Sequence, residues 1–253
     1  MSAKKETLGK TVGIVVAVCL VCSIVVSTAA VGLRSQQNAN ALLDKQTNIL
    51  QAAGMLDAGA TPNQIREKYN TFVEQRFVDL ESGQYVERDA DYDMYRAARD
   101  PEQSIKPQPD SAGIQRRANV ASVYLIKDDA GEVSRIILPV HGSGLWNLMY
   151  AFLAVDSDGN TVRELVYYDH KETPGLGGEV QNPQWQALWD GKKLYDDGEV
   201  AIQVTKNASA SNPYTVDALS GATLTSNGVQ ATLEYWLGQE GFGPYLQKQP
   251  WKS

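Results

Sequence analysis

The sequence predicts an α+β protein, in which a single N-terminal transmembrane helix is followed by an exported antiparallel-sheet domain with flanking helices. One uncharged apolar run near the N-terminus is long enough to cross a bilayer. After residue 120, two segments alternate apolar and polar residues on both sides of an acidic, glycine-containing turn, as hairpins do. The helical patterns are segregated from these strands, and this segregation is typical of the α+β class.

The apolar run "TVGIVVAVCLVCSIVVSTAAVGL" covers residues 11–33. As a helix it would be about 35 Å long, whereas the hydrocarbon core of a bilayer is about 30 Å thick. Lys4, Lys5 and Lys10 precede it, so the positive-inside rule leaves the N-terminus in the cytoplasm. A cleaved signal peptide is the alternative, but its apolar core usually has only about 7 to 15 residues. We therefore expect a retained single-pass anchor in the bacterial inner membrane, in contact with lipid, and a periplasmic location for the rest of the chain.

Charge and cysteine content exclude several classes of protein. The chain of 253 residues has a net charge of −7, and its first 34 residues are basic, so the remainder is more acidic still. An acidic domain without a nucleic-acid-binding motif argues against nucleic acid as a partner. The two cysteines, Cys19 and Cys22, lie inside the apolar run, where no His, Asp or Glu accompanies them. We interpret them as small apolar side chains rather than as a redox pair or half of a metal site.

We divide the chain into three parts. Residues 1–34 form the cytoplasmic N-terminus and the anchor, residues 35–119 a helical and connecting region of the exported domain, and residues 120–253 an α+β core. Within the second part, helical spacing predicts one helix after the anchor and another in "TPNQIREKYNTFVEQRFVDL". Thr61 is the expected N-cap of that second helix and Pro62 its first residue.

The core is expected to contain two similar hairpins. "VASVYLIKDDAGEVSRIILPVHG" and "YAFLAVDSDGNTVRELVYYDHKE" each place a strand, an acidic turn, a second strand and a histidine in the same order. A polar helix is predicted around "NPQWQALWDG", a strand at "EVAIQVT" and an amphipathic helix at "SNGVQATLEYWLGQ".

Three glycine-containing loops lack a simple folding explanation: "HGSGLW" (141–146), "HKETPGLGG" (170–178) and "ALSGATLTSNGVQ" (218–230). Glycines let the backbone approach a ligand, and an indole offers a flat face to it. The full dinucleotide pattern G-x-G-x-x-G is absent. A purely local explanation remains open, since these segments are also suited to be turns and Thr225 is a good helix N-cap.

The titratable residues in these loops allow two conventional kinds of site. His141, His170 and Glu172 have the composition of a two-histidine, one-carboxylate metal site. Asp169, Glu172 and Glu179 could include an acid–base pair. We favour hydrogen-bonded histidines and solvated carboxylates, and we predict neither a metal site nor a catalytic side chain. The motifs of serine hydrolases, P-loop enzymes and zinc proteases are absent from the sequence.

The segment "DALSGATLT" resembles the flavinylation motif D-x-x-(S/T)-G-A-T, in which the threonine is esterified by the phosphate of FMN. Asp217, Ser220, Gly221, Ala222 and Thr223 all match it. The pattern occurs together with "GLW", "HKETPGLGG", "GFGPYL" and one N-terminal span. Over nearly its whole length the chain thus resembles the family of C subunits of the Na⁺-translocating NADH:quinone reductases.

This resemblance implies an electron carrier with FMN attached to Thr223, in a membrane complex that couples NADH oxidation and quinone reduction to Na⁺ export. It also implies the A, B, D, E and F subunits as partners, with the NADH and quinone sites on other subunits, and a flavin transferase that attaches FMN from FAD. Two alternatives remain. One is the G subunit of the related ferredoxin-linked electron transport complex, also an FMN carrier, and the other is a membrane-anchored binding module without a cofactor.

The chemistry of the motif is consistent with this implication. A phosphodiester on Thr223 keeps about one negative charge, which the N-terminus of the following helix is suited to receive. Trp146 and the 173–177 segment are expected to form walls for the flavin ring. The predicted cofactor-binding residues are Ser220, Gly221, Ala222, Thr223, Leu224 and Thr225 from the third loop, with Trp146, Thr173, Gly175, Leu176 and Gly177 from the other two.

Overall fold

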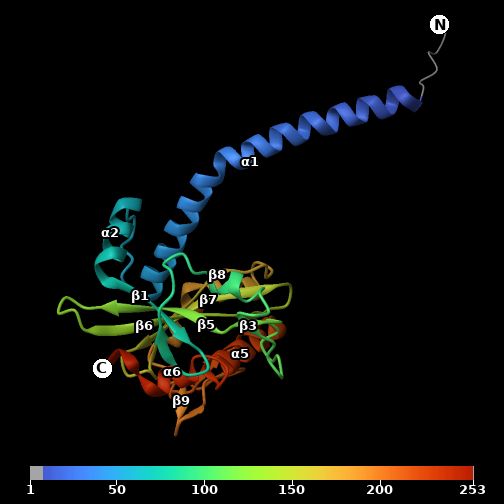
Figure 1. Cartoon of the computed structure of the whole chain (residues 1–253). Helices are drawn as coiled ribbons and strands as arrows, with labels where there is room; N and C mark the ends of the chain where they lie inside the picture. Colours follow the sequence, from blue (N-terminus) through green and yellow to red (C-terminus); the bar gives the residue numbers. More distant parts are fainter. Residues whose placement is uncertain (1–7, 253) are drawn as a thin grey trace. The chain divides into compact units, whose positions relative to one another are not determined.

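The computed structural model describes residues 8–252 (Figure 1). Contacts divide the chain into two compact units, Met1–Lys45 and Gln46–Ser253. The described residues of the first unit are helical, and the second contains the sheet and the remaining elements.

Helix α1 (Leu8–Ala52) is continuous, so the predicted anchor and the helix expected after it are one element. It is long and apolar enough to cross a membrane. The apolar side chains between Val12 and Leu33 are exposed along it, and Cys19 and Cys22 are free and exposed. Its end is formed by a turn at Gly54, which has a positive φ of 65°.

Helix α2 (Pro62–Phe72) begins as predicted, with Thr61 and Gln64 forming a capping box. Its predicted extension through Leu80 is wrong, because the chain from Val73 to Asp79 forms strand β1. This strand pairs along its whole length with a later strand, from Val73 opposite Ile126 to Asp79 opposite Val120. Sheet pairing therefore overrides the local helical pattern in this segment.

A six-stranded antiparallel sheet organises the second unit, in the order β2-β1-β5-β6-β7-β8. The two predicted hairpins are confirmed: the first pairs β5 with β6 and the second pairs β7 with β8. The sheet starts earlier in the sequence than the predicted core, since β1 and β2 precede residue 120. The strands not yet delimited are β2 (Gln84–Val86), β5 (Val120–Lys127), β6 (Val133–Ser143), β7 (Leu148–Asp156) and β8 (Val162–Asp169).

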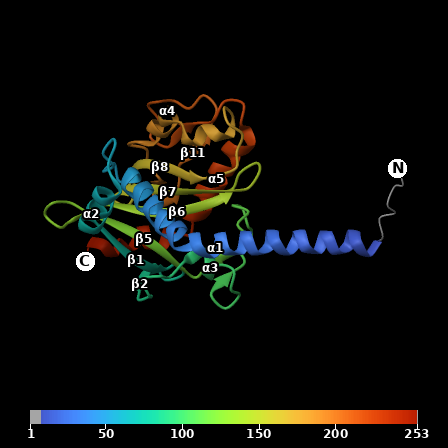
Figure 2. The same cartoon turned by 90° about the horizontal axis from the view of Figure 1, so that it is seen from above.

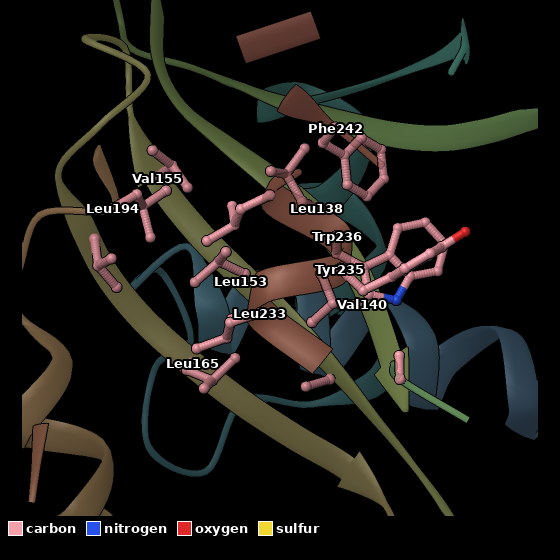
Figure 3. Close-up of a cluster of buried hydrophobic side chains, with 14 of the residues drawn as sticks. Leu138, Val140, Leu153, Val155, Leu165, Leu194, Leu233, Tyr235, Trp236 and Phe242 are labelled. Carbon is pink, nitrogen blue, oxygen red and sulfur yellow. The ribbon is translucent and has the colours of Figure 1, made fainter. Parts of the chain in front are cut away.

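Both faces of the sheet are covered (Figures 1 and 2). Helices α5 (Thr223–Leu237) and α6 (Gly243–Lys248) contribute to the larger core on one face. Figure 3 shows Leu233 and Trp236 of α5 among aliphatic side chains of the sheet such as Leu153. On the other face, Ile49 and Ala52 from the last turns of α1 belong to a second, smaller core.

The remaining elements are short. The predicted helix around residues 182–191 is confirmed as α4 with a following 3₁₀ turn, and Asn182 caps it. The predicted strand at 199–205 is divided in two, and only its second part pairs with the strand before the motif loop. These elements are α3 (Met94–Ala97), β3 (Ser104–Ile105), β4 (Arg117–Ala118), η1 (Gly177–Gln181), α4 (Pro183–Gln186), η2 (Ala187–Trp189), β9 (Tyr195–Asp196), β10 (Glu199–Val200), β11 (Gln203–Thr205), β12 (Thr215–Asp217) and η3 (Pro250–Lys252).

Candidate functional site

The three glycine-containing loops meet at one end of the sheet. In an antiparallel meander the β6–β7 connection and the segment after β8 leave the same end. These are the first and second loops, and α5 packs against β6 so that its N-terminal turn, which continues the third loop, joins them. The sheet topology thus brings together the first and third loops, which are separated by 71 residues of sequence.

Glycines permit the close approach of these loops. A Cβ atom on Gly228 of α5 would lie 2.2 Å from the carbonyl oxygen of Ser143. A Cβ atom on Gly177 would lie 2.4 Å from Oγ1 of Thr225, and one on Gly144 would lie 2.5 Å from a carboxylate oxygen of Glu172. Such separations are well below van der Waals contact. At Gly228 the close atom belongs to the backbone and cannot give way, whereas at Gly177 and Gly144 the side chains of Thr225 and Glu172 would have to shift.

Glu172 connects all three loops. Its side chain is buried, with 5% of the residue exposed. One carboxylate oxygen accepts a hydrogen bond from the backbone N–H of Trp146 at 3.0 Å, and the other accepts one from the hydroxyl of Thr225 at 2.5 Å. A buried carboxylate needs such donors, because an unpaired charge in the interior is costly. The expectation of a solvated carboxylate is therefore wrong for Glu172, which is buried. Its role was missed from the sequence because its partners are distant along the chain.

Helix α5 begins three residues earlier than an N-cap at Thr225 requires. Ala222 occupies the N-cap position, and no side chain caps this end within the described part of the chain. The predicted capping role of Thr225 is therefore wrong: the residue lies inside the first turn, is only 1% exposed, and donates its hydroxyl to Glu172. Ser226 stabilises the turn instead, since its hydroxyl donates to the carbonyl of Ala222 and accepts from the N–H of Leu219.

Thr223 is the first residue of α5 and its side chain is exposed. Gly221, two residues before it, has a φ of 73°, which residues with a side chain rarely adopt. A Cβ atom there would approach the side chain of Leu176 to 3.2 Å, so the second and third loops are in contact at this point. Ser220 is exposed beside them and Ala222 is buried.

Four large apolar side chains around this helix start are exposed to solvent. Trp146 is 67% exposed and Leu224 is 60% exposed, while Leu145 and Leu176 are about half exposed. The Trp146 indole is oriented by a hydrogen bond of 3.2 Å from its N–H to the hydroxyl of Thr173. We call these four residues the apolar rim. Exposed apolar residues gathered on a cluster of loops are typical of a surface that binds a ligand or another protein.

The two histidines have unrelated environments. His141 is buried, its ring stacks on Tyr150 at 5.4 Å, and burial lowers its pKa from the ordinary value of 6.5 to about 4. The expectation of a hydrogen-bonded ring is wrong here, because its Nδ1 has no hydrogen-bond partner among residues 8–252. His170 instead accepts the backbone N–H of Glu172 through Nδ1. Among residues 8–252, no group of three His, Cys, Asp or Glu side chains is arranged to hold a metal ion.

The remaining candidate carboxylates also have different partners. Asp169 forms an ion pair with Lys171, and Glu179 accepts a hydrogen bond from the Asn182 amide at 2.6 Å. Of the three acidic residues considered for acid–base chemistry, only Glu172 has its carboxylate bonded to both of the other loops.

The FMN-binding domain family model matches residues 144–238. All the predicted cofactor-binding residues, from Trp146 to Thr225, fall in this range. The loops fit such a ligand, because they present an exposed hydroxyl at an uncapped helix start next to the apolar rim.

The chain is similar over nearly its whole length to known proteins. It is 52% identical to the C subunit of the Na⁺-translocating NADH-quinone reductase of Yersinia pestis, covering 96% of this chain and 93% of that protein. It is also 52% identical to the protein of the same name from Vibrio anguillarum, covering 98% and 97%.

Two solved structures are similar in fold. The crystal structure of NqrC from Shewanella oneidensis matches with a TM-score of 0.77 and 37% identity, covering 85% of this chain and 98% of that one. The C subunit of the Na⁺-translocating NADH-quinone reductase from Parabacteroides distasonis matches with a TM-score of 0.68 and 31% identity, covering 85% and 96%. Because the likeness in sequence covers nearly the whole chain and the folds agree, the chain belongs to the family of C subunits of Na⁺-translocating NADH-quinone reductases.

Proposed function

We propose that this chain is an electron-carrier subunit that holds FMN through a phosphoester bond to Thr223, within a Na⁺-translocating NADH:quinone reductase. Family membership and the FMN-binding domain support the cofactor and the complex. Bound FMN supplies the redox chemistry, because its ring system takes up and releases electrons. The side chains of the site therefore have to bind, orient and shield the flavin, and they need not react themselves.

The single observation that carries the attachment site is the difference between the two threonines of the motif. Thr223 is exposed at the first position of α5. Thr225 is 1% exposed and its hydroxyl already donates to Glu172. Of these two threonines, only Thr223 is exposed to a large reagent from solvent.

Attachment requires no oxidant or reductant. The Thr223 oxygen forms a bond to the FMN-side phosphorus of FAD while the bond from that phosphorus to the bridging oxygen breaks, so AMP leaves and the hydroxyl proton is released. A separate flavin transferase carries out this exchange, since Thr223 has no general base bonded to it among the contacts of the described chain. The ester formed keeps about one negative charge, which the uncapped N-terminus of α5 stabilises.

The apolar rim and the backbone of the second loop hold the ring in this proposal. Trp146 and Leu176 offer apolar contact area, and Thr173 fixes the indole orientation. Gly175, with a φ of 76°, has open space where a Cβ would stand, and this leaves room next to the rim. Gly177 brings the loop against Thr225, and Ser220 and Leu224 flank the ester.

Assembly into the membrane complex also implies partner subunits and a membrane orientation for this chain. We propose contacts with the A, B, D, E and F subunits, an anchor in the inner membrane, and a periplasmic location of residues 35–253, because Lys4, Lys5 and Lys10 precede the apolar run of α1. The G subunit of the ferredoxin-linked complex is not favoured, since relatives about half identical over their full length are named as C subunits of the Na⁺-translocating enzyme.

The cofactor is tested by expressing the full chain with and without a flavin transferase and FAD. The visible spectrum of a flavin that resists acid precipitation, together with an intact mass increased by FMN less water, is expected only with the transferase. A colourless protein of unmodified mass in both preparations would refute a covalent cofactor. Alkaline phosphatase fused to the C-terminus checks the orientation: activity is expected, and an inactive fusion with an active cytoplasmic reporter at the same site would contradict it.

A further inference from the structure

Glu172 is the only residue among those described whose side chain bonds to both of the other loops of the site. We propose that Glu172 is the positioning residue of the flavin site: its carboxylate fixes the Trp146 backbone against the first turn of α5 and so sets where the indole stands relative to Thr223. This inference rests on the proposed function, because it assigns the consequence of that positioning to the flavin.

The geometry restricts Glu172 to this one arrangement. Gly144 and Gly177 pack against the carboxylate from two sides, leaving no room for a Cβ atom on either. The backbone N–H of Glu172 is bonded to His170 at 3.2 Å, so the residue is held at both ends. The carboxylate therefore has a fixed place between the β6–β7 loop and α5.

Trp146 depends on hydrogen bonds for its position, because it has few packing contacts. Its side chain is 67% exposed, and its neighbour Leu145 is exposed as well, so the tip of this loop has little packing to hold it. The Gly144 N–H closes the loop by donating to the Asn147 carbonyl, and the bonds from the Trp146 N–H to Glu172 and from its indole to Thr173 fix Trp146 itself. A charge-assisted hydrogen bond is about twice as strong as a neutral one, so the Glu172 bond dominates. The groups that touch a ligand must be held in place by supporting contacts of this kind.

The first test measures hydrogen exchange of the Trp146 backbone amide in the full chain without flavin. In Glu172→Ala this amide should exchange about tenfold faster or more, because a bond to a charged acceptor is lost. In Glu172→Gln, which keeps an uncharged acceptor, the exchange should be about fivefold faster than in the wild type. Amides of the β5–β6 pair should be unaffected in both variants, which shows that the fold is intact.

Glu179→Ala is the matched control, since its carboxylate lies in the same segment but bonds Asn182 instead. It should leave Trp146 exchange at the wild-type rate. Unchanged exchange in Glu172→Ala, or an equal increase in Glu179→Ala, would overturn the proposal. Where Glu172→Ala does not fold, Glu172→Gln decides alone, and a wild-type exchange rate in it would also overturn the proposal.

The second test measures fluorescence anisotropy of FMN after loading by the transferase. Glu172→Ala should carry a full flavin mass increment but a lower anisotropy, since the ring loses its fixed wall, while Glu179→Ala should match the wild type. An unchanged anisotropy in a fully loaded Glu172→Ala contradicts the flavin-positioning role. A wild type without flavin refutes the proposed function instead, and the amide exchange in the flavin-free chain then still decides whether Glu172 positions Trp146.

Discussion

The connections at the two ends of the same sheet differ in where they place polar and apolar side chains. At the end with the β5–β6 and β7–β8 turns, acidic side chains accept hydrogen bonds from backbone N–H groups of their own turns. Asp128 accepts from two backbone N–H groups of its turn, and Asp158 accepts from Asn160 and Thr161. Trp251, from the last 3₁₀ turn, donates to Ser157 and covers this end.

At the opposite end, the connections leave large apolar side chains exposed and place a carboxylate in the interior. The apolar rim faces solvent there, and Glu172 is buried beneath it. Hydrogen bonds within the turns explain the two turns of the first end, whereas the second end departs from ordinary folding preferences. Such departures are expected at functional sites, because a ligand rather than the chain completes the surface.

The largest expected difference between the two ends is in the stability lost when a glycine is replaced by alanine. Gly228→Ala places a Cβ 2.2 Å from the Ser143 carbonyl oxygen, so α5 must move from β6, at a cost of roughly 3 to 5 kcal/mol in the free energy of unfolding. Gly131→Ala at the turn end has open space and only a positive φ to strain, so about 1 kcal/mol is expected. Denaturant unfolding followed by tryptophan fluorescence measures both, and equal costs would contradict the close packing of the site loops.

The ends should also respond to acid in different pH windows. Burial depresses the pKa of His141 from 6.5 to about 4 in the folded state, so the unfolded chain binds the proton first. The stability associated with neutral His141 is thus present above pH 6.5 and is lost as the pH falls towards 4, by about 3 kcal/mol. Unfolding free energies of His141→Phe should lack this loss, and an unchanged pH profile would show that the buried ring does not control it.

Asp158 acts in a lower window. Burial alone would raise its pKa, but hydrogen bonds from Thr161 and Asn160 and the charge of Lys193 outweigh burial and lower the pKa from 3.8 to about 2. Its contribution is present above pH 3.8 and disappears as the pH falls towards 2. Asp158→Asn should therefore lower the free energy of unfolding above about pH 4 and approach the wild type as the pH falls towards 2, by less than the effect of His141→Phe, because solvent screens the half-exposed carboxylate. A difference from the wild type that stays the same from pH 6 down to pH 2 would contradict this assignment.

The turn end could be predicted from sequence, while the site end could be predicted only in part. Alternation around "DDAG" and "DSDGN" specifies both hairpins, because the information is local. Thr223 stood out through its motif. The partner of Thr225 did not, since Glu172 lies 53 residues away and only the sheet topology brings the two together. The same reason explains the wrong helix over Val73–Asp79, where pairing with β5 decides the structure.

The smallest expected effect on stability is that of Trp146→Ala. The indole is mostly exposed, so its loss should change the free energy of unfolding by no more than about 0.5 kcal/mol. In the flavin-loaded chain, however, FMN fluorescence should rise, since a stacked indole quenches the flavin. Unfolding curves and fluorescence yield measure the two effects. A large loss of stability with unchanged flavin fluorescence would mean that Trp146 supports the fold rather than the ligand.

The central claim is that FMN is attached to Thr223 and not to Thr225, and peptide mass spectrometry of residues 218–230 tests it most directly. After loading by the transferase, the wild-type peptide should carry one FMN, and Thr223→Ala should carry none while remaining folded. Thr225→Ala should lose roughly 1 to 3 kcal/mol of stability, because Glu172 keeps a buried unsatisfied oxygen, yet retain the FMN. FMN that persists in Thr223→Ala, or that disappears only in folded Thr225→Ala, would contradict the account.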